Sequence, residues 1–271
     1  MNLQQASRCL FARSVKNLRN GLILSGALLL LTIVTLTQHG PIADTALVLT
    51  IATIQLCQMW MKYRALYWFA LADEPRRMAQ FEYGLGHPPS ALRCAAIEKT
   101  AGVCDAPTDT KYWLSQKPVG PTRMAEMVLE SSFYTNYLAD KCKGIFWWIG
   151  ITGTVIALIV IVAAYELRDT TRTSDLTAHI IVLVFVFFLT GDFWSFYLQY
   201  RDLADAAQRS HEQAFELLRR GIITENDALE LAMTYNTAVA QSPPVFSFLH
   251  KRYKDQIEVL FKRNFGTLMG L

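Results

Sequence analysis

The chain has 271 residues, of which 52% are hydrophobic and 18% charged, with a mean hydropathy of +0.21 and a formal net charge of +3. A typical soluble domain carries about 25% charged residues, so this apolar excess excludes a disordered chain and argues against an ordinary enzyme domain in water. Because the excess is concentrated in four stretches, the composition predicts a membrane protein.

Each of the four apolar stretches is close to the ~20 residues that a helix needs to cross a bilayer. They are Leu22–Thr37, Thr45–Met61, Gly144–Tyr165 and Ala178–Tyr197. We therefore expect an all-α membrane protein, with four transmembrane helices in two hairpins and a mainly helical cytoplasmic domain. The expected segments are an N-terminal helix at 1–21, hairpins at 22–61 and 144–199, an insert at 62–143 and a helical tail at 200–271.

The basic residues predict an orientation for these helices. Of the 26 Lys and Arg, 24 lie in the first twenty residues, in 62–143 or in 200–271, and only Arg168 and Arg172 lie in the short connections within the hairpins. Basic residues near membrane ends accumulate on the cytoplasmic side. Both termini and both large polar segments are therefore expected in the cytoplasm.

The polar segments also predict helices. Pro75 should interrupt the helix that follows the second apolar run, and Gly84–Pro89 should end it. A short helix is expected at Ala91–Lys99. A longer one at Arg123–Lys143 has apolar residues at helical spacing and leads into the third run.

After the fourth run, the helix should continue to Arg220 and end at Gly221, because glycine accepts the left-handed conformation at little cost. Thr224 and the acidic residues that follow predict the start of another helix. Ser242-Pro-Pro should end it. The last helix is expected to be amphipathic, with one apolar stripe formed by Phe246, Leu249, Tyr253, Ile257, Leu260 and Phe261.

Polar residues within the apolar runs indicate either packing between helices or an aqueous path. Asp192 is the acidic residue of the fourth run, and it could anchor the chain at the lipid headgroups or line the vestibule of a pore. The pore-lining candidates are Thr50, Thr53, Gln55, Gln58 and Asp192.

Basic and aromatic residues of the 62–143 insert could bind a nucleotide, since guanidinium groups pair with phosphate and aromatic rings stack on bases. The alternative is an ordinary solvated surface, because the insert has eleven basic and nine acidic residues. The nucleotide-binding candidates are Arg76, Arg77, Arg93, Lys99, Tyr112, Trp113 and Arg123.

Enzyme-like motifs are incomplete in this chain. Gly84-Leu-Gly86 lacks the third glycine of a dinucleotide loop, and His211-Glu212 lacks the second histidine of a zinc-protease helix. His87, Cys94 and Cys104 do not have the spacing of a metal site. We expect a protein that is not an enzyme and has no catalytic residues, cofactor or metal.

The layout and several short segments resemble the SMODS-associated four-transmembrane effectors. The resemblance is carried by the helix Arg201–Arg220, by Ser242-Pro243-Pro244-Val245-Phe246, by Arg252-Tyr253-Lys254, and by Trp113 followed by Glu130-Ser-Ser-Phe-Tyr-Thr-Asn136. It covers nearly the whole chain, through short motifs. None of these motifs assigns a ligand contact to an individual residue.

The resemblance implies a role in bacterial anti-phage defence, in which a cyclic oligonucleotide made on infection causes the effector to permeabilise the inner membrane. The expected partners are then the lipid bilayer, further copies of the chain in a homo-oligomer and a cyclic oligonucleotide, and no nucleic-acid polymer. Two alternatives stay open. One is a membrane scaffold or sensor that recruits a soluble partner through Phe246 and Tyr253 without forming a pore, and the other is a small transporter.

Overall fold

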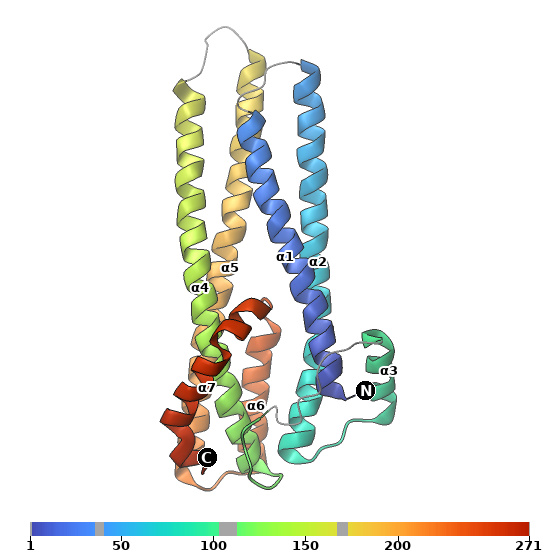
Figure 1. Ribbon diagram of the computed structural model, residues 1–271, viewed down its shortest axis with the longest axis vertical. Helices are drawn as coiled ribbons and strands as arrows, with labels where there is room; N and C mark the ends of the chain where they lie inside the picture. Colours follow the sequence, from blue (N-terminus) through green and yellow to red (C-terminus); the bar gives the residue numbers. More distant parts are fainter. Residues whose placement is uncertain (1, 36–40, 103–112, 167–172, 271) are drawn as a thin grey trace. The chain divides into compact units, whose positions relative to one another are not determined.

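The computed structural model describes residues 2–35, 41–102, 113–166 and 173–270 (Figure 1). Side chains are described for 2–28, 49–102, 113–155, 158–159 and 193–270. Over these residues the chain forms seven helices and no strand, which confirms the helical part of the predicted fold. The helices are α1 (Leu3–Thr35), α2 (Pro41–Leu85), α3 (Ala91–Ala101), α4 (Pro121–Glu166), α5 (Thr173–Arg220), α6 (Glu225–Ala240) and α7 (Ser247–Met269).

Local sequence signals place several helix ends correctly. Helix α5 ends at Arg220, and Gly221 follows with φ of 76°, in the left-handed region that glycine tolerates. Thr224 caps α6, because its hydroxyl accepts from the backbone N–H of Asp227 while the Asp227 carboxylate accepts from the backbone N–H of Thr224. This reciprocal pair satisfies two backbone donors that the first turn of a helix leaves open.

The expected interruption at Pro75 is wrong, because α2 continues through this residue. A proline inside a helix removes the hydrogen bond to the carbonyl four residues earlier, here that of Leu71. Next to this position, the Ser7 hydroxyl of α1 donates to the carbonyl of Ala72 over 2.9 Å. Pro75 itself is buried, so packing in the interior compensates for the local cost of the proline.

The predicted four transmembrane helices are wrong, and so is the multi-pass inner-membrane location derived from them. In the parts of the chain that the structure describes, no helix has the length and apolarity that crossing a membrane requires. Over their described residues, the apolar runs are sections of helices 33 to 48 residues long. In α2, Gln55, Gln58 and Lys62 interrupt the apolar residues. Much of the four runs falls in 29–48, 156–157 and 160–192, outside the described side chains.

The chain divides into two compact units that are described separately. Unit 1 comprises Met1–Val15, Leu66–Cys142 and Gln199–Leu271, and unit 2 comprises Lys16–Ala65 and Lys143–Leu198. The long helices α1, α2, α4 and α5 each contribute residues to both units.

Two hydrophobic clusters lie among the described residues of unit 1. One lies among α4, α5, α6 and α7, with Met124, Leu231 and Phe261 fully buried. The Phe133 ring of α4 lies 5.5 Å from that of Phe261, where α7 (red) runs alongside α4 (Figure 1). The other cluster joins α1, α2 and α3 through residues such as Leu10. Burial of these apolar side chains is the main stabilising contribution to the unit.

Unit 2 is held by polar contacts as well as by apolar packing. The side-chain amide of Gln58 in α2 donates to the Ser25 hydroxyl of α1 over 2.5 Å. The Trp194 indole of α5 donates to the Thr154 hydroxyl of α4 over 3.3 Å, and its ring lies against Gly150. A Cβ atom at Gly150 would lie 3.3 Å from this ring, so the glycine permits the close approach.

Candidate functional site

The pore-lining candidates of α2 do not share one environment. Thr50 and Thr53 are exposed, and the Thr53 hydroxyl donates to the Leu49 carbonyl of its own helix over 2.8 Å. Gln55 is half-buried, whereas Gln58 is fully buried and bonded to α1. The side chain of Asp192 lies outside the described residues.

Two of the nucleotide-binding candidates, Arg76 and Arg77, are paired with a buried carboxylate. Asp73 is fully buried, and its Oδ1 accepts from Nε and Nη2 of Arg76 over 2.8 and 2.6 Å. Nε of Arg77 lies 2.9 Å from Oδ2 of Asp73. The Arg76 guanidinium also donates to Asn236 of α6 over 2.8 Å, and this amide donates to Gln80 over 3.0 Å. Arg76 therefore links α2 to α6, whereas Arg77 pairs within α2.

The other nucleotide-binding candidates are dispersed over unit 1. Arg93 pairs with Glu74 over 3.1 Å, and Lys99 is exposed. The Trp113 indole donates to Ser131 over 3.2 Å. Arg123 is half-buried, and its Nε is enclosed without a hydrogen-bond acceptor. Tyr112 lies outside the described residues. The structure does not bring this set together at one phosphate or base site.

Two buried carboxyl groups of α4 bind the segment that follows Trp113. Glu130 accepts from the backbone N–H of Leu114 over 2.9 Å, and Glu126 accepts from the Ser115 hydroxyl over 2.5 Å. Burial raises the pKa of Glu130 to about 7, although the hydrogen bond from Leu114 opposes this. Burial also raises the pKa of Glu126. Each carboxyl therefore uses one oxygen to hold this segment against α4.

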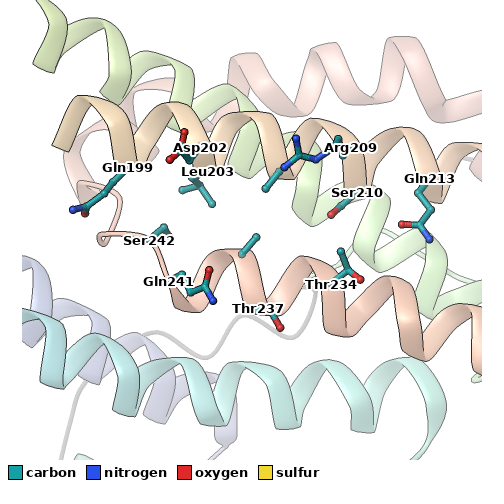
Figure 2. A pocket seen from close by; sticks show the side chains of 12 residues that line it. Gln199, Asp202, Leu203, Arg209, Ser210, Gln213, Thr234, Thr237, Gln241 and Ser242 are labelled. Atoms are coloured by element: carbon teal, nitrogen blue, oxygen red, sulfur yellow. The ribbon is translucent and has the colours of Figure 1, made fainter. Parts of the chain in front are cut away.

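A groove lined by polar side chains and by aliphatic carbon atoms lies between α5 and α6 in unit 1 (Figure 2). Its volume is about 560 Å³. Amides and hydroxyls from both helices line it, with Leu203 and Ser210 buried beneath. The lining residues are Gln199, Asp202, Leu203, Ala206, Arg209, Ser210, Gln213, Thr234, Thr237, Ala238, Gln241 and Ser242.

The charges of the groove are Arg209 and Asp202. Asp202 accepts from the guanidinium of the adjacent Arg201, with Nε 3.2 Å from Oδ1. Arg209 is exposed, and none of the ion pairs or hydrogen bonds among the described residues involves its guanidinium. A guanidinium in this state can form a bidentate pair with a phosphate or carboxylate.

Sequence reasoning missed this groove. A signal was present in α5, where Gln199, Asp202, Ala206, Arg209 and Gln213 recur at intervals of three and four and so share one helix face. Such a stripe normally indicates a solvated surface. Only the fold places the face beside a second polar helix, α6, about thirty residues further along the chain.

The segments that carry the family resemblance lie close together in unit 1. Asn136 of α4 donates to the Ala204 carbonyl of α5 over 2.9 Å, and the Tyr200 hydroxyl donates to the Pro244 carbonyl over 2.8 Å. The rings of Tyr137 and Tyr253 lie 5.8 Å apart. Phe246 is buried and Tyr253 half-buried, so these residues pack within the chain and do not form an open recruiting surface.

The described residues hold no group of three His, Cys, Asp or Glu side chains that could bind a metal ion. Comparison of the chain with protein-family models, with curated proteins and with solved structures gives no match.

Proposed function

We propose that the chain is a non-catalytic effector of bacterial anti-phage defence that binds a cyclic oligonucleotide in the groove between α5 and α6. The observation that carries the proposal is Arg209, an exposed guanidinium without an ion-pair partner among the described residues, in a groove of about 560 Å³ rich in hydrogen-bonding groups. The defence role itself comes from the resemblance. Membrane permeabilisation is not part of the proposal.

The groove chemistry suits a phosphodiester with polar attachments. Arg209 would pair with a phosphate. The amides of Gln213 and Gln241 can donate and accept, as the edges of nucleobases require, and the hydroxyl of Thr234 suits a ribose hydroxyl. The groove has no aromatic lining residue, so we expect recognition through hydrogen bonds and not through base stacking.

The proposal is tested by calorimetric titration of the full chain with cyclic dinucleotides containing two adenines, two guanines or one of each, and with inorganic phosphate. We expect saturable binding of at least one cyclic dinucleotide, weakened tenfold or more by Arg209→Ala, because a charged hydrogen bond contributes about 1.5–3 kcal/mol. Arg219→Ala is the matched control, since Arg219 is an exposed arginine of the same helix outside the groove.

Two results would overturn the proposal. One is the absence of binding by every cyclic dinucleotide tested, at concentrations up to the millimolar range. The other is binding that Arg209→Ala and Arg219→Ala weaken equally, which would indicate general attraction of anions to a basic protein and not recognition in the groove.

A further inference from the structure

In unit 2, α2 has one face that is buried by its own chain. Ile51, Gln58 and Ala65 recur every seven residues and are 3%, 0% and 1% exposed. Gln58 on this face makes the 2.5 Å hydrogen bond to Ser25 of α1. On this side, α2 is therefore already covered by the rest of its own chain.

The opposite face of α2 is apolar as well, yet it is exposed. Leu49, Leu56, Trp60 and Tyr63 are 64%, 67%, 53% and 68% exposed. At about 100° per residue, Leu56 lies about 160° around the helix from Gln58. We call these four residues the outer stripe. A helix that is apolar on two opposite faces is normally covered on both.

The outer stripe is large enough to form an interface. A large side chain that is half exposed or more leaves on the order of 100 Å² accessible, so the stripe and the neighbouring Met59 present roughly 500 Å². This lies within the range of about 300–600 Å² for the largest apolar patch on a typical monomer, a patch that is often functional. It also supplies more than half of the ~800 Å² that each partner buries in a standard interface.

The spacing of the outer stripe fits a helix as its partner. Intervals of seven, four and three residues match the alternation of threes and fours by which one helix packs into the groove of another. A second copy of the chain offers such a helix with the same stripe, and a two-fold pairing would bury both stripes together.

The charges beside the stripe decide the direction of the pairing. Arg64 flanks it and stacks on Trp60, and every charged side chain described in unit 2 is basic. In a parallel pair, Arg64 would lie beside its own copy. In an antiparallel pair centred near Leu56, the two Arg64 residues are about 24 Å apart at 1.5 Å per residue. This distance exceeds the Debye length of about 8 Å.

We propose that the outer stripe of α2 binds the outer stripe of a second copy of this chain in an antiparallel, two-fold pair centred near Leu56. This proposal is independent of ligand binding in the groove of unit 1. It requires only the exposed face of α2 and no spanning helix.

Sedimentation velocity across a range of protein concentrations tests the pairing. We expect a dimer at micromolar concentration, and a dissociation constant at least tenfold weaker for the double variant Leu56→Asp with Tyr63→Asp. The control is Phe248→Asp with Val259→Asp on α7, where both residues are also exposed and the dimer should persist. Circular dichroism should give equal helix content for all three proteins.

Cys57 reports the register, because it is exposed, has a free thiol and neighbours Leu56. A short bismaleimide should join two copies through Cys57, and Cys57→Ser should abolish the product. In the Cys57→Ser background, Thr50→Cys lies one heptad away on the same side of α2. The antiparallel pair separates the two new thiols by about 18 Å along the axis, so little product is expected.

Four outcomes would overturn the proposal. They are a monomer at all concentrations, a dimer unaffected by the aspartate substitutions in the stripe, efficient linking through Thr50→Cys, and a monomer that floats with phosphatidylglycerol vesicles through the same stripe. The third outcome would indicate parallel helices, and the fourth would assign the stripe to a lipid surface.

Discussion

Asp73 is the residue on which the contact between α2 and α6 depends. Its buried carboxylate accepts from Arg76 and lies 2.9 Å from Arg77, and Arg76 in turn reaches Asn236, which lies 160 residues away in the chain. Removing one partner of a buried pair leaves the other charge uncompensated, which costs more than the pair contributes.

We therefore predict that Asp73→Ala lowers the free energy of unfolding by about 3 kcal/mol. The neighbouring Glu74→Ala is the control, because its pair with Arg93 is exposed and should contribute less than about 1 kcal/mol. Urea unfolding followed by circular dichroism measures both values. Equal effects of the two substitutions would mean that Asp73 is not a buried anchor.

Arg76 and Arg77 also illustrate what the sequence could not provide. Their residue types fit phosphate binding, and nothing within one helix turn distinguishes a free arginine from one that is paired in the interior. Asp73 lies three and four residues before them, which is compatible with pairing. The contact of Arg76 with Asn236 depends on tertiary structure, and no periodicity in the sequence predicts it.

At the scale of elements, the signals that succeeded act over short distances. Gly221 and Thr224 set helix ends through the backbone of one turn, so the sequence predicts them well. The groove between α5 and α6 depends on which faces of two helices meet. The prediction of four transmembrane helices was wrong for a related reason. Mean hydropathy averages composition and does not tell which partner an apolar face packs against.

The approach of α2 to α4 in unit 1 gives a prediction at this scale. A Cβ atom at Gly84 would lie 2.8 Å from Sδ and 3.3 Å from Cα of Met124, which is fully buried. Sδ can move aside, but a shift of Cα moves the helix. We expect Gly84→Ala to destabilise the protein by about 1–3 kcal/mol, the usual cost of overpacking.

Gly144 in α4 is the matched control for Gly84. Nothing lies within 4 Å of a Cβ atom at Gly144, and it is within a helix. Alanine there should stabilise the protein by up to about 1 kcal/mol through its higher helix propensity. Thermal unfolding of both variants tests the pair. A stabilising Gly84→Ala would indicate that the two helices are farther apart than described.

At the scale of the whole molecule, the burial of titratable groups changes stability in opposite directions on the two sides of neutral pH. Burial raises the pKa of Glu130 to about 7 and lowers the pKa of His211. Glu130 retains its proton in the folded state above pH 4.5, where the unfolded chain loses it, so its contribution to stability falls as pH rises toward 7. His211 stays neutral on folding, so its contribution falls as pH drops below 6.5.

Glu130→Gln should remove the contribution of Glu130 to the pH dependence of the free energy of unfolding. The amide oxygen can still accept from Leu114, and the side chain no longer titrates. Relative to the wild type, we expect little change at pH 5 and a gain of up to about 3 kcal/mol at pH 8, the equivalent of a pKa raised from 4.5 to about 7. Stability of the variant should then rise with pH, because His211 still titrates.

Urea unfolding at pH 5, 6, 7 and 8 measures the pH dependence of both proteins, with the exposed Glu216→Gln as control. Parallel pH profiles of wild type and Glu130→Gln would show that Glu130 is already ionised in the folded protein at neutral pH.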